Sequence, residues 1–202
     1  MKKIILAAIV LLSAVSYGQY RWEVSGGPTF SNLSIEGQET NSSTGFYFNA
    51  GYGYVTGVRA KTSFVFSIDL LQRKSEIESG AVSVPSFEYK ALQVGFNPKF
   101  RYLFNSGKDR FRPFINVGPS FRLNLDVEYA GQELEAGEEY EQLVIGGVYG
   151  IGFSQMIGEM FDIMAEVGAM NDFTDNLIDV DSKFFDIYAR VGVRFRIYDA
   201  RR

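Results

Sequence analysis

Residues 111–127 read FRPFINVGPSFRLNLDV, and this stretch decides the fold. Its odd positions are all apolar, and its even positions are polar or small except for Phe114. A period of two is that of a β-strand, whose side chains point alternately to opposite faces. The charges of Arg112, Arg122 and Asp126 exclude a strand that is buried on both faces. One face must therefore meet an apolar medium, and the other face a polar one.

The same alternation recurs in other segments of the chain. They are residues 20–31, 46–54, 64–70, 92–102, 143–154, 161–169 and 185–197. Long polar segments alternate with short turns between them: the long ones are residues 34–44, 73–86, 128–142 and 171–182, and the turns lie near Gly57, Asn105–Asp109 and Gly158. This spacing predicts an all-β fold, an eight-stranded antiparallel up-and-down transmembrane β-barrel with four long extracellular loops and three short periplasmic turns.

The chain begins with Met1-Lys2-Lys3, continues with an apolar run from Ile4 to Val15, and then has Ser16 and Gly18 as small residues. A basic start, a short apolar core and small residues before a cleavage point are typical of a secretory signal peptide. A transmembrane helix needs about 20 apolar residues, so this run is too short to be one. We therefore expect residues 1–18 to be a signal peptide, and residues 19–202 to form one outer-membrane β-barrel domain.

Two kinds of barrel fit the alternation: a membrane barrel with its apolar side outward, and a soluble lipocalin-like ligand-binding barrel with its apolar side inward. Aromatic placement favours the membrane barrel, because Trp22, Tyr102 and Phe161 fall at the end with the short turns and Phe30 and Phe185 at the other. Two aromatic girdles that flank an aliphatic band are typical of proteins in a bilayer. Glycines on the polar faces of the second and sixth segments indicate a crowded interior, where they leave room for neighbouring Arg and Tyr side chains.

Composition excludes several classes of function. The chain has no cysteine, so disulfides and thiolate metal sites are excluded. Of its 20 basic residues, Lys2 and Lys3 lie in the expected signal peptide, which leaves 18 against 24 acidic residues. A nucleic-acid partner is not expected from this balance, because binding to phosphates requires a basic face.

An enzyme is not expected either. The chain has no histidine, so mechanisms that use an imidazole as the base, alone or in a dyad, have no group to move the proton. Ser154 in the sequence GFSQM half-resembles a nucleophile elbow, but the final glycine is missing and the context is a strand. We interpret Ser154 as a small residue of the barrel interior, and we expect neither a catalytic residue nor a cofactor.

The long segments are acidic, and the last of them offers candidate ligands for a divalent cation. These candidates are Asp172, Asp175, Asp179 and Asp181, whose carboxylate oxygens are the ligand type that calcium prefers. Their spacing fits no calcium-binding loop, and a like-charged, solvated loop surface explains them better. We therefore predict no metal site, with these four aspartates as the only candidates in that segment.

The expected interior is crossed by long Arg and Glu side chains, which disfavours a constitutively open channel and leaves a small gated pore as the alternative. The predicted function is that of a non-enzymatic integral outer-membrane protein with a structural or partner-binding role. Its expected partners are outer-membrane lipid and lipopolysaccharide, together with an unidentified periplasmic or surface protein.

Three stretches carry a resemblance to a known family: Gly18-Gln19, residues 94–102 (VGFNPKFRY) and residues 112–120 (RPFINVGPS). The chain resembles the PorT-like outer-membrane β-barrel domain family over nearly its whole mature length, through strand patterns that contain Pro or Gly-Pro. This resemblance implies an eight-stranded barrel in the outer membrane of a Gram-negative bacterium. One branch of that family serves protein secretion and gliding, so the resemblance also implies a link to secretion machinery, but it transfers no functional residue. The chain departs from the usual terminal aromatic residue, because Asp199-Ala200-Arg201-Arg202 follows Tyr198.

Overall fold

The computed structural model describes residues 19–35, 38–56, 61–77, 86–105, 109–158 and 160–197. The expected signal peptide and the chain after Ile197 lie outside these residues. The strands, in chain order, are β1 (Gln19–Ile35), β2 (Thr40–Thr56), β3 (Thr62–Ile77), β4 (Phe87–Leu103), β5 (Phe111–Tyr129), β6 (Gln132–Glu133), β7 (Leu143–Met156), β8 (Phe161–Asp172) and β9 (Ser182–Ile197).

The eight long strands form one closed antiparallel barrel, which confirms the predicted fold class. Each strand pairs with the next one along the chain, and β9 pairs with β1 to close the sheet. The short β6 adds only a small hairpin to the end of β5, through the pairs Glu128↔Glu133 and Tyr129↔Gln132. In the part of the chain that the structure describes, no helix is long and apolar enough to cross a membrane.

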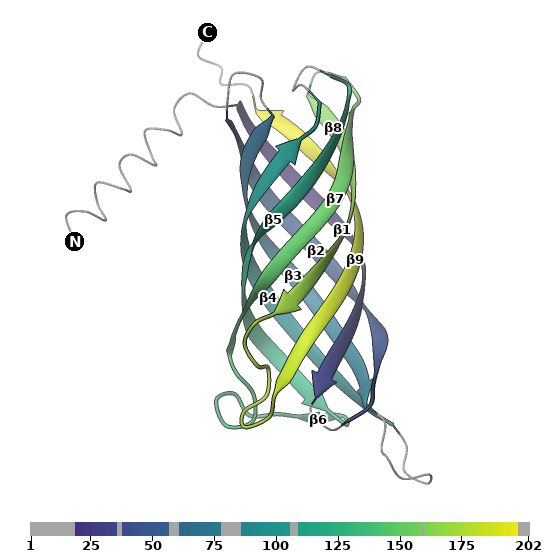
Figure 1. Ribbon diagram of the computed structural model, residues 1–202, viewed down its shortest axis with the longest axis vertical. Coiled ribbons are helices and arrows are strands. Elements are labelled where there is room, and N and C mark those ends of the chain that lie inside the picture. The colour runs from purple at the N-terminus through teal and green to yellow at the C-terminus, as the bar shows by residue number, and fades with distance from the viewer. Residues whose placement is uncertain are drawn as a thin grey trace, which may run out of the picture.

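The two ends of the barrel differ. The start of β1 and the C-terminal ends of β2, β4, β7 and β9 lie together at the upper end in Figure 1, which we call the turn end. The short β6 and the β8–β9 connection lie at the lower end, which we call the loop end.

Burial alternates along the strands in the predicted sense. On β5, Ile115 and Val117 are exposed on the outer face, whereas Arg112, Asn116 and Arg122 are buried inside. Arginines are among the largest fully buried side chains, and large apolar side chains cover the outer surface. The soluble alternative with an apolar side facing inward is therefore excluded, because the outer wall is of the kind that lipid solvates.

The prediction of two girdles around an aliphatic band is only partly right. Midway along β2 and β4, the outer face carries Phe48 and Phe96, where the prediction placed aliphatic residues. The ring of Phe96 stacks on Phe66 of β3 with centroids 6.5 Å apart. By contrast, the outer faces of β8 and β9 are aliphatic between their ends, as at Val167 and Val191. Aromatic and aliphatic side chains are both soluble in hydrocarbon. The bilayer therefore restricts the choice of apolar residue type less in this band than at the membrane–water interface.

The predicted loops 34–44 and 73–86 are too long, because the strands continue into them. Strand β1 runs to Ile35, and β3 runs to Ile77. Beyond Leu70 the same positions of β3 stay buried, but the outer face becomes polar, with Lys74 and Glu76 outside and Leu71 and Ile77 inside. A polar outer face is expected where a strand extends past the bilayer, since water then replaces lipid outside the barrel.

A second correction concerns Val127, which was expected on the outer face with the other odd positions of residues 111–127. Leu125 is 55% exposed, but Val127 is 1% exposed. The pairing between β4 and β5 shifts here, because Leu92 opposes Asp126 while Gln93 opposes Asn124, which leaves Leu125 as an extra residue. Such a β-bulge exchanges the two faces of the strand beyond it.

Candidate functional site

The candidate functional site is the interior of the barrel, the lumen. In the described part of the chain it holds eight buried cationic side chains and six buried carboxylates. The cationic residues are Arg21, Arg73, Lys99, Arg101, Arg112, Arg122, Arg190 and Arg194, and the acidic ones are Glu23, Asp69, Asp162, Glu166, Asp172 and Asp186. An unpaired buried ion costs several kcal/mol, so the pairing of these groups decides whether the interior is stable.

Glu23 of β1 is bound across the lumen by Arg101 of β4, although these strands are not neighbours in the sheet. The two terminal nitrogens of Arg101 donate to the two carboxylate oxygens of Glu23 at 2.7 and 3.1 Å. Its Nε donates to Asn116 Oδ1 at 2.7 Å, and its guanidinium lies 4.5 Å from the ring centroid of Phe114. A bidentate pair of this kind fixes both partners in direction as well as distance.

Glu166 of β8 accepts hydrogen bonds from three side chains on other strands. The donors are Arg190 at 2.8 Å, Tyr188 Oη at 2.7 Å and Asn116 Nδ2 at 2.7 Å. Gly150 on β7 makes room for this cluster, since a Cβ there would lie 2.9 Å from Tyr188 Oη and 2.5 Å from Glu166 Oε1. This arrangement confirms the prediction that lumen glycines leave space for neighbouring side chains.

Asp162 lies nearer the turn end and gathers arginines from three other strands. It forms an ion pair with Arg112, and its Oδ2 lies 3.5 Å from Arg21 Nη1 and 4.0 Å from Arg194 Nη1. One carboxylate here faces three guanidinium groups, so positive charge exceeds negative charge in this layer of the lumen.

Arg73 is the centre of the charged cluster nearest the loop end. It donates to both oxygens of Asp172 at 2.7 and 3.0 Å, and to Asp186 at 2.6 Å. Its guanidinium also lies 4.7 Å from the ring centroid of Phe184. The sequence analysis missed this triad, because it assigned Arg73 and Asp172 to solvated loops. The signal that could have identified it is the alternation Leu71, Arg73, Ser75 and Ile77, which continues that of the strand.

Beyond Arg73, the loop end of the lumen is filled by apolar side chains, which we call the apolar plug. Its buried members come from β1, β3, β4, β5, β9 and the β6–β7 connection: Leu33, Ile35, Ile77, Tyr89, Ala91, Val127, Tyr140 and Phe184. Leu134 and Leu177 of the loop-end connections pack against this cluster. The plug has the composition of a protein core, so it excludes water from the loop end of the lumen.

Ser154, which half-resembles a nucleophile in the sequence, lies beside an arginine in the lumen. Ser154 lies on β7 and is buried inside the barrel, as expected of a small interior residue. Its strand neighbour across the sheet is Arg112. A guanidinium is permanently protonated, so it cannot serve as the base that a serine nucleophile requires.

The structure does not bring the four candidate aspartates together. Asp172 points into the lumen, where it pairs with Arg73. Asp175 and Asp181 lie 3.5 and 2.9 Å from Lys183 Nζ, and the hydrogen bond from Lys183 lowers the pKa of Asp181. Asp179 has a positive φ of 60° in the turn between them. Among the described residues, no group of three or more His, Cys, Asp or Glu side chains is disposed to hold a metal ion.

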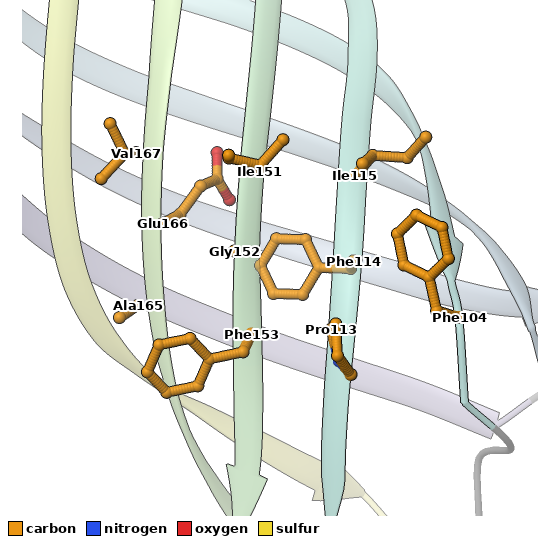
Figure 2. Close-up of a pocket in the computed structure, with 10 residues that line it drawn as sticks. All are labelled: Phe104, Pro113, Phe114, Ile115, Ile151, Gly152, Phe153, Ala165, Glu166 and Val167. Atoms are coloured by element: carbon orange, nitrogen blue, oxygen red, sulfur yellow. The ribbon is translucent and has the colours of Figure 1, made fainter.

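An open hollow of about 550 Å³ lies on the outer wall of the barrel, over β5, β7 and β8. Figure 2 shows Pro113 and Phe153 beside Gly152, with Phe104 and Val167 at the two sides of the hollow. A Cβ at Gly152 would lie 2.8 Å from Phe114 Cζ, so the missing side chain lets the Phe114 ring pass behind β7. The hollow has an almost wholly apolar lining and faces the same side as the exposed apolar residues, so it belongs to the wall that lipid contacts.

Comparison with known proteins agrees with this architecture. Residues 4–195 match the family described as "Outer membrane protein beta-barrel domain". Among solved structures, Neisserial surface protein A (NspA) is similar with a TM-score of 0.54 and 17% identity, over 87% of this chain and 97% of that one. The outer membrane protein OprG from Pseudomonas aeruginosa is similar with a TM-score of 0.53 and 12% identity, over 90% of this chain and 98% of that one.

A search of the curated proteins found no match. At such low identity, the likeness to NspA and OprG shows the fold alone. The family match, by contrast, extends over most of the sequence. The chain belongs to the outer membrane protein beta-barrel domain family, and it is an outer-membrane β-barrel protein.

Proposed function

We propose that this protein is a non-enzymatic, non-conducting outer-membrane barrel with a structural or partner-binding role. The observation that carries the proposal is the filled lumen. The apolar plug occupies its loop end, and the triad of Arg73, Asp172 and Asp186 lies next to the plug on the side of the turn end. A small gated pore would have to displace both, and it is not favoured by any feature of the lumen.

Planar-bilayer recording of the purified barrel tests this proposal. We expect no stable conductance steps at moderate voltages, because the apolar side chains of the plug fill the loop end of the lumen in the described residues. A double variant that removes bulk from the plug, Tyr140→Ala with Phe184→Ala, is the matched positive control for the recording. Stable open-channel conductance of the unmodified protein would contradict the proposal and favour the gated pore.

Binding of a partner is expected at the ends of the barrel, because lipid covers the wall and side chains fill the lumen. The loop end presents exposed carboxylates in the β6–β7 connection, among them Glu135, Glu138 and Glu141. Their charge suits a cationic protein surface. Lipopolysaccharide, the lipid of the outer leaflet, is the expected neighbour at this height.

A crosslinking experiment in cells distinguishes a partner-binding role from a structural one. Because the chain has no cysteine, Glu138→Cys at the loop end and Asn105→Cys at the turn end each provide a single attachment point for a photo-crosslinker. Both residues are exposed. A specific protein adduct from either position, identified by mass spectrometry, supports partner binding and tells which side the partner occupies. Adducts with lipid alone from both positions support a structural role.

Two finer features of the proposal stay predictions. Residues 1–18 are proposed to be the signal peptide that directs export. The PorT-like resemblance suggests a link to protein-secretion machinery, which an adduct with a secretion component would support. A divalent-cation site at Asp175, Asp179 and Asp181 is not proposed, since Lys183 already lies between two of these carboxylates.

A further inference from the structure

The half of the lumen nearest the turn end has an excess of buried positive charge. In the described residues it contains six cationic side chains, which are Arg21, Lys99, Arg101, Arg112, Arg190 and Arg194. Three buried carboxylates face them: Glu23, Asp162 and Glu166. Buried charges are normally compensated by a partner, so an excess of three positive charges points to a missing anion.

The three carboxylates are already engaged by other groups. Glu23 is held by Arg101, Glu166 by Arg190 and Asp162 by Arg112. Arg194 is left with only long contacts, since its Nε lies 3.5 Å from Glu23 and its Nη1 lies 4.0 Å from Asp162. Its Nη2 is buried and has no hydrogen-bond partner, and the same is true of the ammonium of Lys99.

A small cavity lies against Arg194. Its polar lining includes Arg21, Glu23, Ser63, Arg101 and Arg194, and its volume is about 10 Å³. A cavity of this size holds about one water-sized species. Glu23 contributes negative charge to the lining, but Arg101 binds both of its oxygens.

Gly53 of β2 also lines the cavity and keeps it open. A Cβ at this position would meet its nearest neighbour, Val65 Cγ2, at 3.5 Å, which is an ordinary contact. An alanine therefore fits here without displacing the wall, and its methyl group would take up space that the cavity now offers.

We propose that this cavity is a binding site for a monatomic anion of the size of chloride or bromide. Guanidinium N–H groups of Arg194 and Arg101 are the donors, and the anion offsets part of the positive excess in this half of the lumen. The site is independent of the partner-binding role proposed above.

Crystals of the barrel grown in sodium bromide test the site directly through anomalous scattering. We expect an anomalous peak inside the cavity, within contact distance of Arg194, in the wild-type protein. The peak is expected to disappear in Gly53→Ala and to persist in Gly26→Ala, a glycine outside this cavity whose added Cβ also makes only ordinary contacts. Cavity density without an anomalous signal in saturating bromide would identify a water molecule and overturn the proposal.

Unfolding in detergent micelles provides a second readout that needs no crystals. Sodium bromide should raise the urea midpoint of the wild type above that in sodium methanesulfonate of equal ionic strength, because an anion that binds only the folded state stabilises it. Gly53→Ala should show the same midpoint in both salts. Equal midpoints for the wild type in the two salts would also overturn the proposal.

Discussion

At the scale of single residues, Gly150 shows how closely the interior is packed. Glu166 is held by Arg190, Tyr188 and Asn116, so it cannot move aside for a new methyl group without breaking these hydrogen bonds. We expect Gly150→Ala to destabilise the barrel by roughly 1–3 kcal/mol, as overpacking does in other cores. The measurement is the free energy of unfolding by urea in lipid vesicles. Gly53→Ala, where the nearest atom is 3.5 Å away, is the control and should cost much less.

Arg73 is the residue whose loss should cost most among the charged groups near the loop end. Replacing it by methionine leaves Asp172 and Asp186 buried without their cation. Breaking a buried pair from one side costs about 3–5 kcal/mol, so we expect a loss of that size in the same unfolding measurement. Lys90→Met is the matched control, because Lys90 forms a solvent-exposed pair with Glu128, and surface pairs of this kind contribute little to stability. Equal effects of the two substitutions would refute the buried triad.

The sequence predicted individual residues best within the lipid-facing part of each strand. There, the requirement for apolar side chains outside and polar ones inside produces a period of two in the sequence. Val117 on the outer face and Arg122 in the lumen were both predicted correctly. Arg73 and Asp172 were misassigned because a single charged residue in a sequence is compatible both with a solvated loop and with the lumen of a barrel. The alternation from Leu71 to Ile77 could have placed Arg73 on a strand, but its partners across the barrel are not encoded locally.

At the scale of the strands, a β-bulge interrupts the period of two, as on β5. On β5 the change occurs at one residue, between Leu125 outside and Val127 inside. Single-cysteine variants can map this change, because the chain has no native cysteine. We expect Leu125→Cys to react readily with a maleimide in detergent and Val127→Cys to be protected until the barrel unfolds. Equal reactivity at the two positions would mean that the alternation continues and that the bulge is absent.

The ends of the strands were the part that sequence reasoning placed least well. Predicted strands stopped where the outer face turned polar, as at Leu70, although the backbone pairing continues to Ile77. The pattern there still alternates, but the outer side is polar and the inner side carries both Leu71 and Arg73. A sequence shows that such a segment is still a strand only if the two solvents outside the barrel, lipid and then water, are considered in turn. The predicted extracellular loops were consequently too long, and the apolar plug was missed.

At the scale of the whole molecule, the distribution of side chains along most of the barrel is the reverse of that in a soluble protein, because apolar side chains lie outside and charged ones inside. Lipid solvates the apolar wall, and ion pairs fill much of the lumen. Among the described residues, the buried apolar cluster with most members lies at the loop end, and two smaller ones lie deeper in the lumen, around Tyr47 and around Phe114. This division explains how a chain with near-neutral mean hydropathy of −0.04 can be a membrane protein. Closure of β9 onto β1 leaves no sheet edge, which a lipid environment requires of any strand structure.

Substitution of Val117 by arginine tests the outward apolar face most directly. Val117 lies on the lipid side of β5 and is 46% exposed. In lipid vesicles, Val117→Arg should lower the free energy of unfolding by roughly 2–4 kcal/mol, the cost of a cationic side chain on the lipid face near the bilayer midplane. Val117→Leu, which changes size but not polarity, is the control and should leave stability nearly unchanged. An arginine variant as stable in lipid as the wild type would contradict the orientation of every strand described above.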